Sequence, residues 1–177
     1  EAQLFLDVTD EGSNQVLFTF SNNGPEASSI ADIYFDDDFP LLTFNNFVYN
    51  TTGVAFTVDA NPGNLPGGNS FAFTSNYDYD SASPAQPNGV NPGEELGILF
   101  DLTTGYDFNN VLAGFDNGSF RVGIHVQGFE TGGSESFIAP GDPGDPGDPN
   151  TPVPEPATMF LLGSGLIGAG IIRRKRK

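Results

Sequence analysis

The chain has no cysteine among its 177 residues. It therefore has no disulfide framework, no thiolate metal site and no thiol nucleophile, so its stability must come from packing. Tryptophan is absent too, whereas phenylalanine occurs 17 times. Phenylalanine fills the space between two layers without a polar atom to satisfy, which suits a large apolar core.

Basic residues are scarce outside the last five positions. Residues 1–156 hold all 23 acidic residues and a single basic residue, Arg121, for a net charge of −22, whereas residues 173–177 contribute +5. A body this acidic repels nucleic acid and anionic lipid, and it attracts divalent cations or basic partners. Nucleic-acid binding is not expected, because the one basic cluster adjoins a hydrophobic run.

Helical periodicity is scarce as well. From Glu1 to about Ile138, short runs alternate with period two between Gly, Pro, Asn and Asp residues, which predicts antiparallel strands with one buried face. The expected strands, about eight, lie in LFLDV (4–8), QVLFTFS (15–21), SSIADIYFDDD (28–38), FNNFVYN (44–50), GVAFTVD (53–59), FAFTSNY (71–77), GILFDL (97–102) and FRVGIHVQGF (120–129). The first two flank the tight-turn sequence DEGSN and should form a hairpin.

One helical interruption is expected in YDFNNVLAGFDNG, where Asp107 is a suitable N-cap and Gly114 or Gly118 could end the helix. Short strands separated by Gly/Pro-rich turns favour an all-β fold over a helical or α/β fold. We therefore predict one domain over residues 1–138, an antiparallel β-sandwich of the jelly-roll or immunoglobulin-like kind.

The composition of residues 139–153 predicts a linker. Gly-Asp-Pro occurs three times there, and residues 140–156 hold seven of the chain's 14 prolines. Three triplets are too few for a collagen-like triple helix, so a spacer is expected. As an extended chain at about 3.1 Å per residue, residues 140–153 would span roughly 40 Å.

An uncharged run at residues 157–172 follows the linker and predicts a single transmembrane helix. At about 1.5 Å per residue the helix is roughly 24 Å long, slightly short for a bilayer core, but Arg173 and Arg174 can snorkel. The basic tail, residues 173–177, marks the cytoplasmic side, so the body should lie outside. That topology needs an export signal peptide, and its removal is consistent with a chain that begins at Glu1.

Small residues form ridges on the expected helix, spaced to let another helix approach closely. They are Gly163, Ser164, Gly165, Gly168 and Ala169. These residues either dock the helix against a processing enzyme or are incidental to a plain membrane anchor.

The C-terminal segment contains VPEPAT, then the expected glycine-rich hydrophobic helix and then a basic terminus. This order resembles the PEP-CTERM sorting signal of exopolysaccharide-producing Gram-negative bacteria. The resemblance covers about residues 152–177, with the signal itself at residues 154–177. The resemblance implies an exosortase, an inner-membrane protease or transpeptidase, as partner, and a mature protein at the cell surface or in the extracellular matrix. The sorting and processing residues that it implies are Pro154, Glu155, Pro156, Arg173, Arg174, Lys175, Arg176 and Lys177. Phrases such as FTFSNNGP and GIHVQGF are similar to β-rich ectodomains found on such tails, which carry no function to transfer.

Metal binding by the body is the first chemical option. Asp36, Asp37 and Asp38 at a strand end, or Asp78 and Asp80, are hard oxygen ligands of the kind that calcium takes in loops. Neither group matches an EF-hand or a nonapeptide calcium repeat. Solvated acidic loops that keep sheet edges from pairing are the alternative, and no other cofactor is indicated.

Catalysis has little support in the sequence. His125 is the only histidine, and alternation places it with Arg121 and Gln127 on the polar side of a strand. No GxSxG nucleophile elbow is present, and the many carboxylates make accidental pairs common. His125 is therefore expected to be structural or part of a binding face, and no enzyme activity is predicted.

Three classes of function remain open. The leading hypothesis is a noncatalytic surface or matrix protein linked to biofilm and exopolysaccharide. A second is a carbohydrate-binding module, in which Tyr34, Tyr49, Tyr77 and Tyr79 would stack on sugar rings. A calcium-dependent adhesin or a hydrolase is the third.

Overall fold

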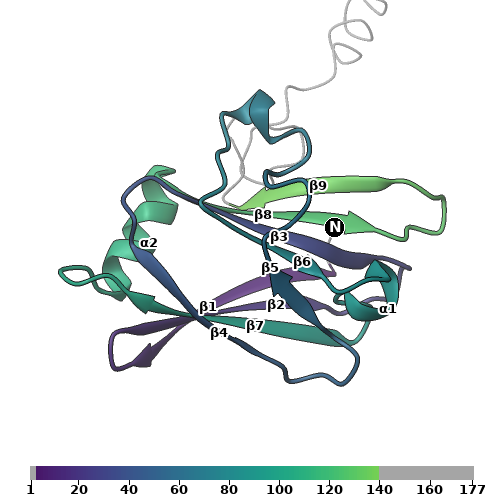
Figure 1. The fold of residues 1–177 in the computed structure, drawn as a ribbon, viewed down its shortest axis with the longest axis horizontal. Coiled ribbons are helices and arrows are strands. Elements are labelled where there is room, and N and C mark those ends of the chain that lie inside the picture. The colour runs from purple at the N-terminus through teal and green to yellow at the C-terminus, as the bar shows by residue number, and fades with distance from the viewer. Residues whose placement is uncertain (1–2, 140–177) are drawn as a thin grey trace, which may run out of the picture. The chain divides into compact units, whose positions relative to one another are not determined.

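The computed structural model describes residues 3–139, in which two antiparallel sheets pack face to face (Figure 1). The first sheet has the order β1 (Leu4–Gly12), β2 (Gln15–Asn22), β7 (Glu94–Leu102) and β4 (Leu42–Val48). The second has the order β5 (Phe56–Val58), β6 (Tyr77–Ser81), β3 (Ser29–Asp37), β8 (Phe120–Gln127) and β9 (Ser134–Ala139). The predicted all-β sandwich is confirmed, and β9 ends one residue beyond the expected boundary at residue 138.

Phenylalanine dominates the space between the sheets, as the composition predicts. The rings of Phe18 and Phe35 meet edge to face at a centroid distance of 5.0 Å, and Phe35 meets Phe100 at the same distance. All three side chains are fully buried. Edge-to-face contacts of this kind add about 0.5–1.5 kcal/mol each to the free energy of burial. The interlocked rings therefore fix the spacing and the alignment of the two sheets.

The expected helix is present as α2 (Phe108–Asn117). Asp107 caps it: its Oδ1 accepts a hydrogen bond from the backbone N–H of Asn110 at 3.2 Å, and the Asn110 side chain accepts one from the N–H of Asp107 at 2.8 Å. Gly118, with φ of 77°, ends the helix. This reciprocal capping box satisfies two of the backbone donors that a helix start leaves unpaired.

One strand prediction is wrong, and one strand of the structure was not predicted. The segment FAFTSNY does not form a strand; it includes the end of the short 3₁₀-helix η1 (Gly68–Phe71), and β6 begins only at its last residue. The strand β9 was not expected from the sequence. A short helical turn, α1 (Ala85–Asn88), interrupts the long loop before β7. Seven of the expected strand segments do contain a strand of the sandwich.

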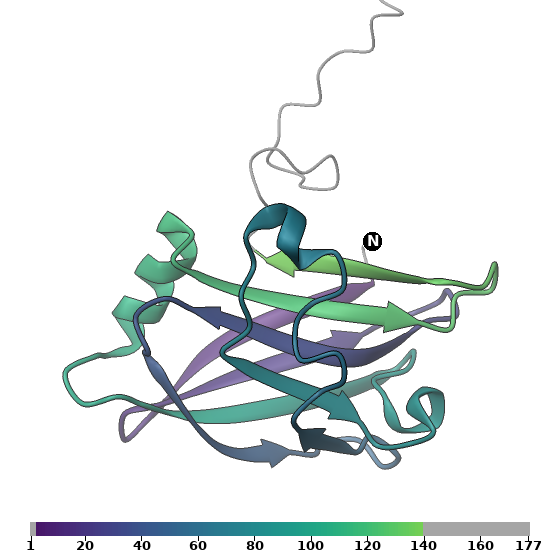
Figure 2. The same cartoon turned by 45° about the horizontal axis from the view of Figure 1, so that its top comes forward.

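The burial of β3 also differs from the prediction of one buried face, because all nine of its residues are buried. At the Ser29 end of β3, the Ser29 hydroxyl donates to the backbone oxygen of Gln86 in α1. Further along, the cover is the connection between β5 and β6, residues 59–76, here called the crossing loop. It runs over the outer face of the second sheet (Figure 2). Its residues Leu65 and Phe73 pack on Tyr34 and form a second, smaller apolar cluster.

No helix within residues 3–139 has the length and apolar character needed to cross a bilayer. The expected transmembrane helix at residues 157–172, the linker after Ala139 and the basic tail all lie outside the described residues.

Candidate functional site

The polar residues of interest gather on the outer face of the second sheet. Register places Asp80 of β6, Asp32 of β3 and His125 of β8 side by side in one cross-strand row. Nδ1 of His125 lies 2.8 Å from Oδ2 of Asp32. The predicted position of His125 on the polar side of its strand is confirmed, and its partner carboxylate was not foreseen.

The protonation of Asp32 reflects this environment. Burial raises the pKa of Asp32, the hydrogen bond with His125 lowers it, and the Asp80 carboxylate raises it again. Only 5% of Asp32 is exposed. A carboxyl held between an imidazole and a second carboxyl is suited to hold or share a proton within the sheet.

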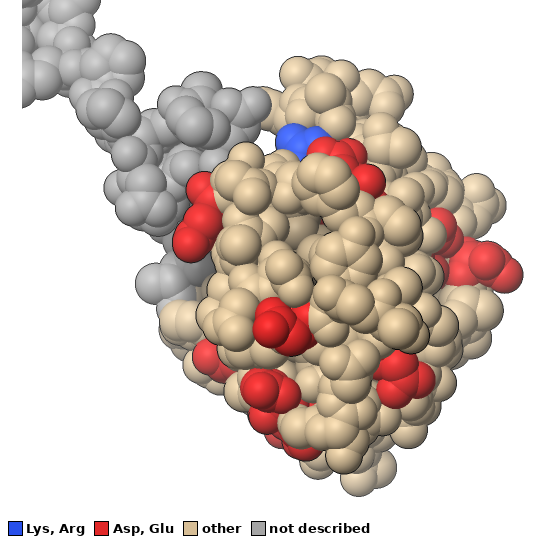
Figure 3. Space-filling view, turned by 90° about the vertical axis from the view of Figure 1, so that its left-hand side faces the viewer, with Lys and Arg blue, Asp and Glu red and all other residues tan. Residues whose placement is uncertain are grey.

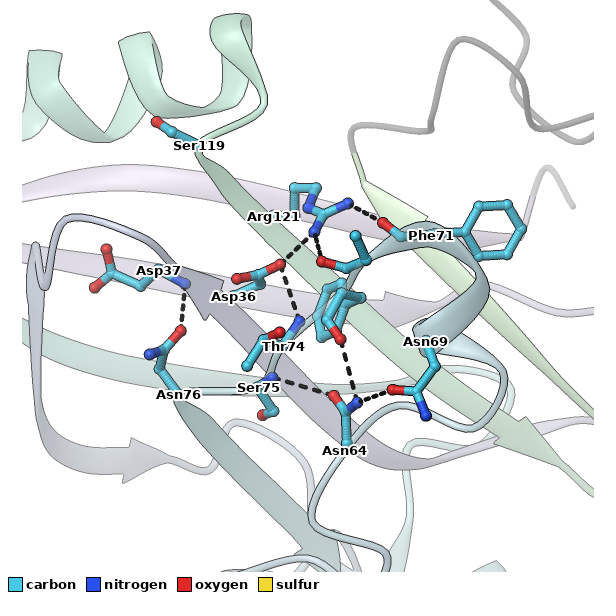
Figure 4. Close-up of polar contacts among 12 residues, drawn as sticks. Asp36, Asp37, Asn64, Asn69, Phe71, Thr74, Ser75, Asn76, Ser119 and Arg121 are labelled. Atoms are coloured by element: carbon cyan, nitrogen blue, oxygen red, sulfur yellow. Dashed lines mark hydrogen bonds and ion pairs between the residues drawn. The ribbon is translucent and has the colours of Figure 1, made fainter.

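Asp36 of β3 and Arg121 of β8 form a second cross-strand pair, four residues before His125 on β8. There Arg121 binds the crossing loop (Figure 4). Its guanidinium donates to the backbone oxygens of Phe71 at 2.8 Å and Ala72 at 2.7 Å. It also pairs with Oδ2 of Asp36 at 2.5 Å, and it lies 5.4 Å from the centre of the Phe73 ring. A planar fork with several donors is the group best suited to bind a carboxylate and two carbonyls at once.

Asparagine side chains complete the attachment of the crossing loop. The Asn64 side chain donates to the backbone oxygen of Phe73 at 3.2 Å and accepts from the N–H of Ser75 at 3.1 Å. The Asn76 side chain accepts from the N–H of Asp37 at 2.7 Å. These side chains replace the backbone partners that an irregular segment lacks, so the loop has a defined conformation without regular secondary structure.

Glycine lets the crossing loop approach the sheet. Gly123 of β8 lies opposite Tyr34 of β3. A Cβ atom at Gly123 would lie 2.8 Å from Leu65 Cδ2 and 3.2 Å from the Phe73 ring. Any side chain at this position would push the loop outward. The Tyr34 hydroxyl meanwhile donates to the backbone oxygen of Pro62 at 2.9 Å.

The three aspartates considered for calcium have separate contacts. Asp36 pairs with Arg121 and also accepts from the N–H of Thr74, while Oδ2 of Asp37 accepts from the N–H of Leu42 at 3.1 Å. Asp38 is exposed. Within residues 3–139, no three His, Cys, Asp or Glu side chains gather closely enough to hold a metal ion. Calcium binding by Asp36, Asp37 and Asp38 thus stays a prediction from the sequence.

The tyrosines considered for sugar stacking divide into core and surface residues. Tyr34 and Tyr79 are buried, and the Tyr77 hydroxyl donates to the backbone oxygen of Leu42. Tyr49 is 48% exposed, and its ring lies 5.8 Å from that of Phe47. Of the four, Tyr49 is therefore the one with a large surface open to a ligand.

The surface of the body is acidic. Arg121 is the one lysine or arginine among residues 3–139. In Figure 3 the blue surface lies directly beside red surface, in line with the ion pair between Arg121 and Asp36. Because this cation is engaged within the fold, the outer surface offers carboxylates and neutral groups to a partner.

The described residues thus define a two-sheet β-sandwich whose gathered polar groups bond to one another and hold a loop against the sheet. The chain as a whole is a protein with a sorting signal: residues 152–177 match the family model of the PEP-CTERM protein-sorting motif. This confirms the resemblance drawn from the sequence. No curated protein matches the chain.

The motif supports export to the cell surface, with transient anchoring in the membrane and processing by an exosortase. The individual sorting residues, from Pro154 to Lys177, and the small-residue ridge from Gly163 to Ala169 lie outside the described residues. Their roles stay predictions from the sequence.

Proposed function

We propose that the chain is a noncatalytic surface or matrix protein of a Gram-negative bacterium, held in the inner membrane by residues 157–172 until an exosortase cuts near Pro154, Glu155 and Pro156. The observation that carries this proposal is the PEP-CTERM motif at residues 152–177. The body supports it, because its Asp32–His125 and Asp36–Arg121 pairs bond within the fold.

Replacement of Pro154, Glu155 and Pro156 by alanine tests the sorting role in a host that supplies an exosortase. The variant should accumulate as a larger, membrane-retained species, as seen by intact mass and by fractionation. A matched control replaces Pro143, Pro146 and Pro149 of the linker by alanine and should be processed normally. Normal processing of the first variant would contradict the proposal.

The proposed link to biofilm and exopolysaccharide concerns the mature protein. Loss of the chain from its host should weaken the cohesion of the biofilm, and added protein should restore it. The body should show no turnover of polysaccharide or peptide substrates. Unchanged cohesion in the absence of the chain would count against the matrix role.

Carbohydrate binding is a second candidate, favoured by the exposed ring of Tyr49. The Tyr49 hydroxyl donates to the backbone oxygen of Phe56 at 3.1 Å and accepts from the Phe56 N–H at 3.2 Å, so the residue also holds the β4–β5 side of the sandwich. Titration of two Tyr49 variants with the host's own polysaccharide should separate sugar stacking by the ring from the structural role of the hydroxyl. Tyr49→Phe keeps the ring and removes the hydrogen bonds, whereas Tyr49→Ala removes both. Stacking predicts binding by Tyr49→Phe and loss by Tyr49→Ala; equal affinity of the two would remove this candidate.

A further inference from the structure

The sandwich is open on the side where β1 and β9 end the two sheets. Within residues 3–139, β1 pairs only with β2, and β9 pairs only with β8. On the opposite side, the hydroxyl of Tyr49 bonds to both backbone groups of Phe56 and so ties the β4 end of one sheet to β5 of the other. The backbone groups on the outer edge of β9 are therefore free, among the described residues, to pair with another strand.

An apolar groove of about 160 Å³ runs between these two edge strands. Its lining includes Leu4, Leu6, Phe20, Val122, Ile124 and Phe137. Leu4 and Leu6 on β1 and Phe137 on β9 are only partly buried, although they point toward the core. A side chain entering this β1–β9 groove would remove apolar surface from water at a gain of about 25 cal/mol per Å².

A wider hollow of about 730 Å³ continues the groove, because Leu4 and Phe137 line both. The hollow lies between the loop that precedes β3 and the turn that joins β8 to β9. Three exposed carboxylates line it, those of Glu26, Glu130 and Glu135, and no basic residue does. One end of the β1–β9 groove is thus strongly negative.

The β9 edge lacks the features that keep edge strands from pairing. Natural edges carry lysine, proline or a bulge, or are very short. The strand β4 has a register shift between Phe44 and Asn46, and β5 is only three residues long. The six residues of β9, SESFIA, include neither lysine nor proline, and their single charge is Glu135. The β9 edge thus has neither the irregular register of β4 nor the short length of β5, and Glu135 is its one protective charge.

We propose that β9 and the β1–β9 groove bind an extended segment of a basic partner protein. The segment adds a strand to β9, directs apolar side chains at alternate positions into the groove, and places lysine or arginine beside Glu26, Glu130 and Glu135. Charge favours a basic partner over a second copy of this chain, because residues 1–139 hold acidic residues throughout and Arg121 as the one cation. The strand pairing supplies affinity, and the glutamates supply the preference for a basic sequence.

The test uses the full chain in detergent and a synthetic probe peptide, Lys-Lys-Thr-Val-Thr-Val-Thr-Val, with a fluorescent label. Fluorescence anisotropy should show binding that weakens with added salt, and hydrogen exchange should slow within residues 134–139. A peptide of the same composition with its valines consecutive, Lys-Lys-Thr-Thr-Thr-Val-Val-Val, should bind at least about tenfold more weakly, because only alternation directs every apolar side chain to one face. Equal binding of the two peptides would overturn the proposal.

Charge variants test the same site without touching the core. Replacing Glu26, Glu130 and Glu135 by glutamine should weaken peptide binding about tenfold at low salt. The matched control replaces the exposed Glu11, Asp38 and Asp116 by their amides, which changes the net charge equally and should leave affinity within about twofold. An equal effect of both sets would mean nonspecific attraction and would overturn the proposal.

Other occupants give different results. If a second copy fills the groove, the chain will be dimeric by light scattering and Phe137→Lys will make it monomeric. If residues 140–177 of the chain itself fill the groove, their removal will speed hydrogen exchange in β9 before any peptide is added. Either result would overturn the assignment of the site to a partner protein.

Discussion

His125 and Asp32 form a cross-strand pair in which Nδ1 of the imidazole lies 2.8 Å from Oδ2 of the carboxylate, with the two side chains 12% and 6% exposed. The pair joins β3 and β8 by side chains as well as by backbone, and Asp80 of β6 lies beside Asp32 on the other side of β3. The one histidine of the chain thus has a defined structural role.

Removal of this imidazole should raise the pKa of Asp32, because the hydrogen bond with His125 is the interaction that lowers it. In His125→Ala, an NMR titration of the Asp32 carboxyl should show the increase. The free energy of unfolding should fall by roughly 2 to 4 kcal/mol, since a buried carboxyl loses its partner. In a double-mutant cycle, Asp32→Asn should recover part of that loss. An unchanged Asp32 pKa would show that the contact does not form in solution.

Arg121 should be the main attachment of the crossing loop. In Arg121→Met, Asp36 and two backbone oxygens lose their donor, so the free energy of unfolding should fall by about 3 kcal/mol. The free energy of unfolding of Arg121→Lys should lie between those of Arg121→Met and the wild type, because an ammonium cannot reach all three acceptors in one plane. Limited proteolysis within residues 59–76 should be faster in Arg121→Met, and cleavage at wild-type rates would contradict this role.

Buried carboxyls should make the body less stable as the pH rises through the acidic range. Burial raises the pKa of Asp37 above its ordinary value of 3.8, although backbone N–H groups oppose the effect. Its stabilising contribution is therefore complete below pH 3.8 and is lost as the pH rises through the higher pKa of the folded state. Burial raises the pKa of Asp32 and of Asp78 in the same direction.

Asp37→Asn tests this dependence. Oδ1 of Asp37 has no hydrogen-bond partner among the described residues, while Oδ2 accepts from the N–H of Leu42, which an amide oxygen can also do. Relative to the wild type, the variant should gain on the order of 1 kcal/mol between pH 4 and pH 7 in urea unfolding. Asp116→Asn, at an exposed position on α2, should change the slope much less. Parallel pH profiles for Asp37→Asn and the wild type would contradict the prediction.

Gly114 allows α2 to lie against β8. A Cβ atom there would be 2.7 Å from Phe120 Cβ, and overpacking of this kind costs about 1–3 kcal/mol. The gain in helix propensity from Gly114→Ala is only about 1 kcal/mol, so the variant should be destabilised. Ala113→Gly, at an exposed position on the same helix, should lose about 1 kcal/mol by propensity alone. A stabilised Gly114→Ala measured by urea unfolding would show that the helix can shift.

Local patterns predicted the parts of the fold in which one face of a strand or helix meets the core. The alternation in QVLFTFS produced β2 with every second residue buried, and Asp107 capped α2 as its position suggested. The sorting motif of the tail could be recognised from the sequence for a different reason. Its PEP motif, uncharged run and basic terminus are consecutive in the chain, so their meaning does not depend on long-range contacts.

The tertiary structure decided what depends on residues far apart in the chain. Alternation in FAFTSNY favoured a strand, but Arg121 and Asp36 bind this segment through its backbone, and Phe73 packs on Tyr34 instead of in the main core. The same contacts cover Tyr34 on the outer face of β3 and remove it from the surface. Sequence determined which residues are apolar, charged or able to cap a helix. Which carboxylate meets Arg121, the one arginine within residues 3–139, or the single histidine followed only from strand register, because pairing brings together residues 85 and 93 positions apart.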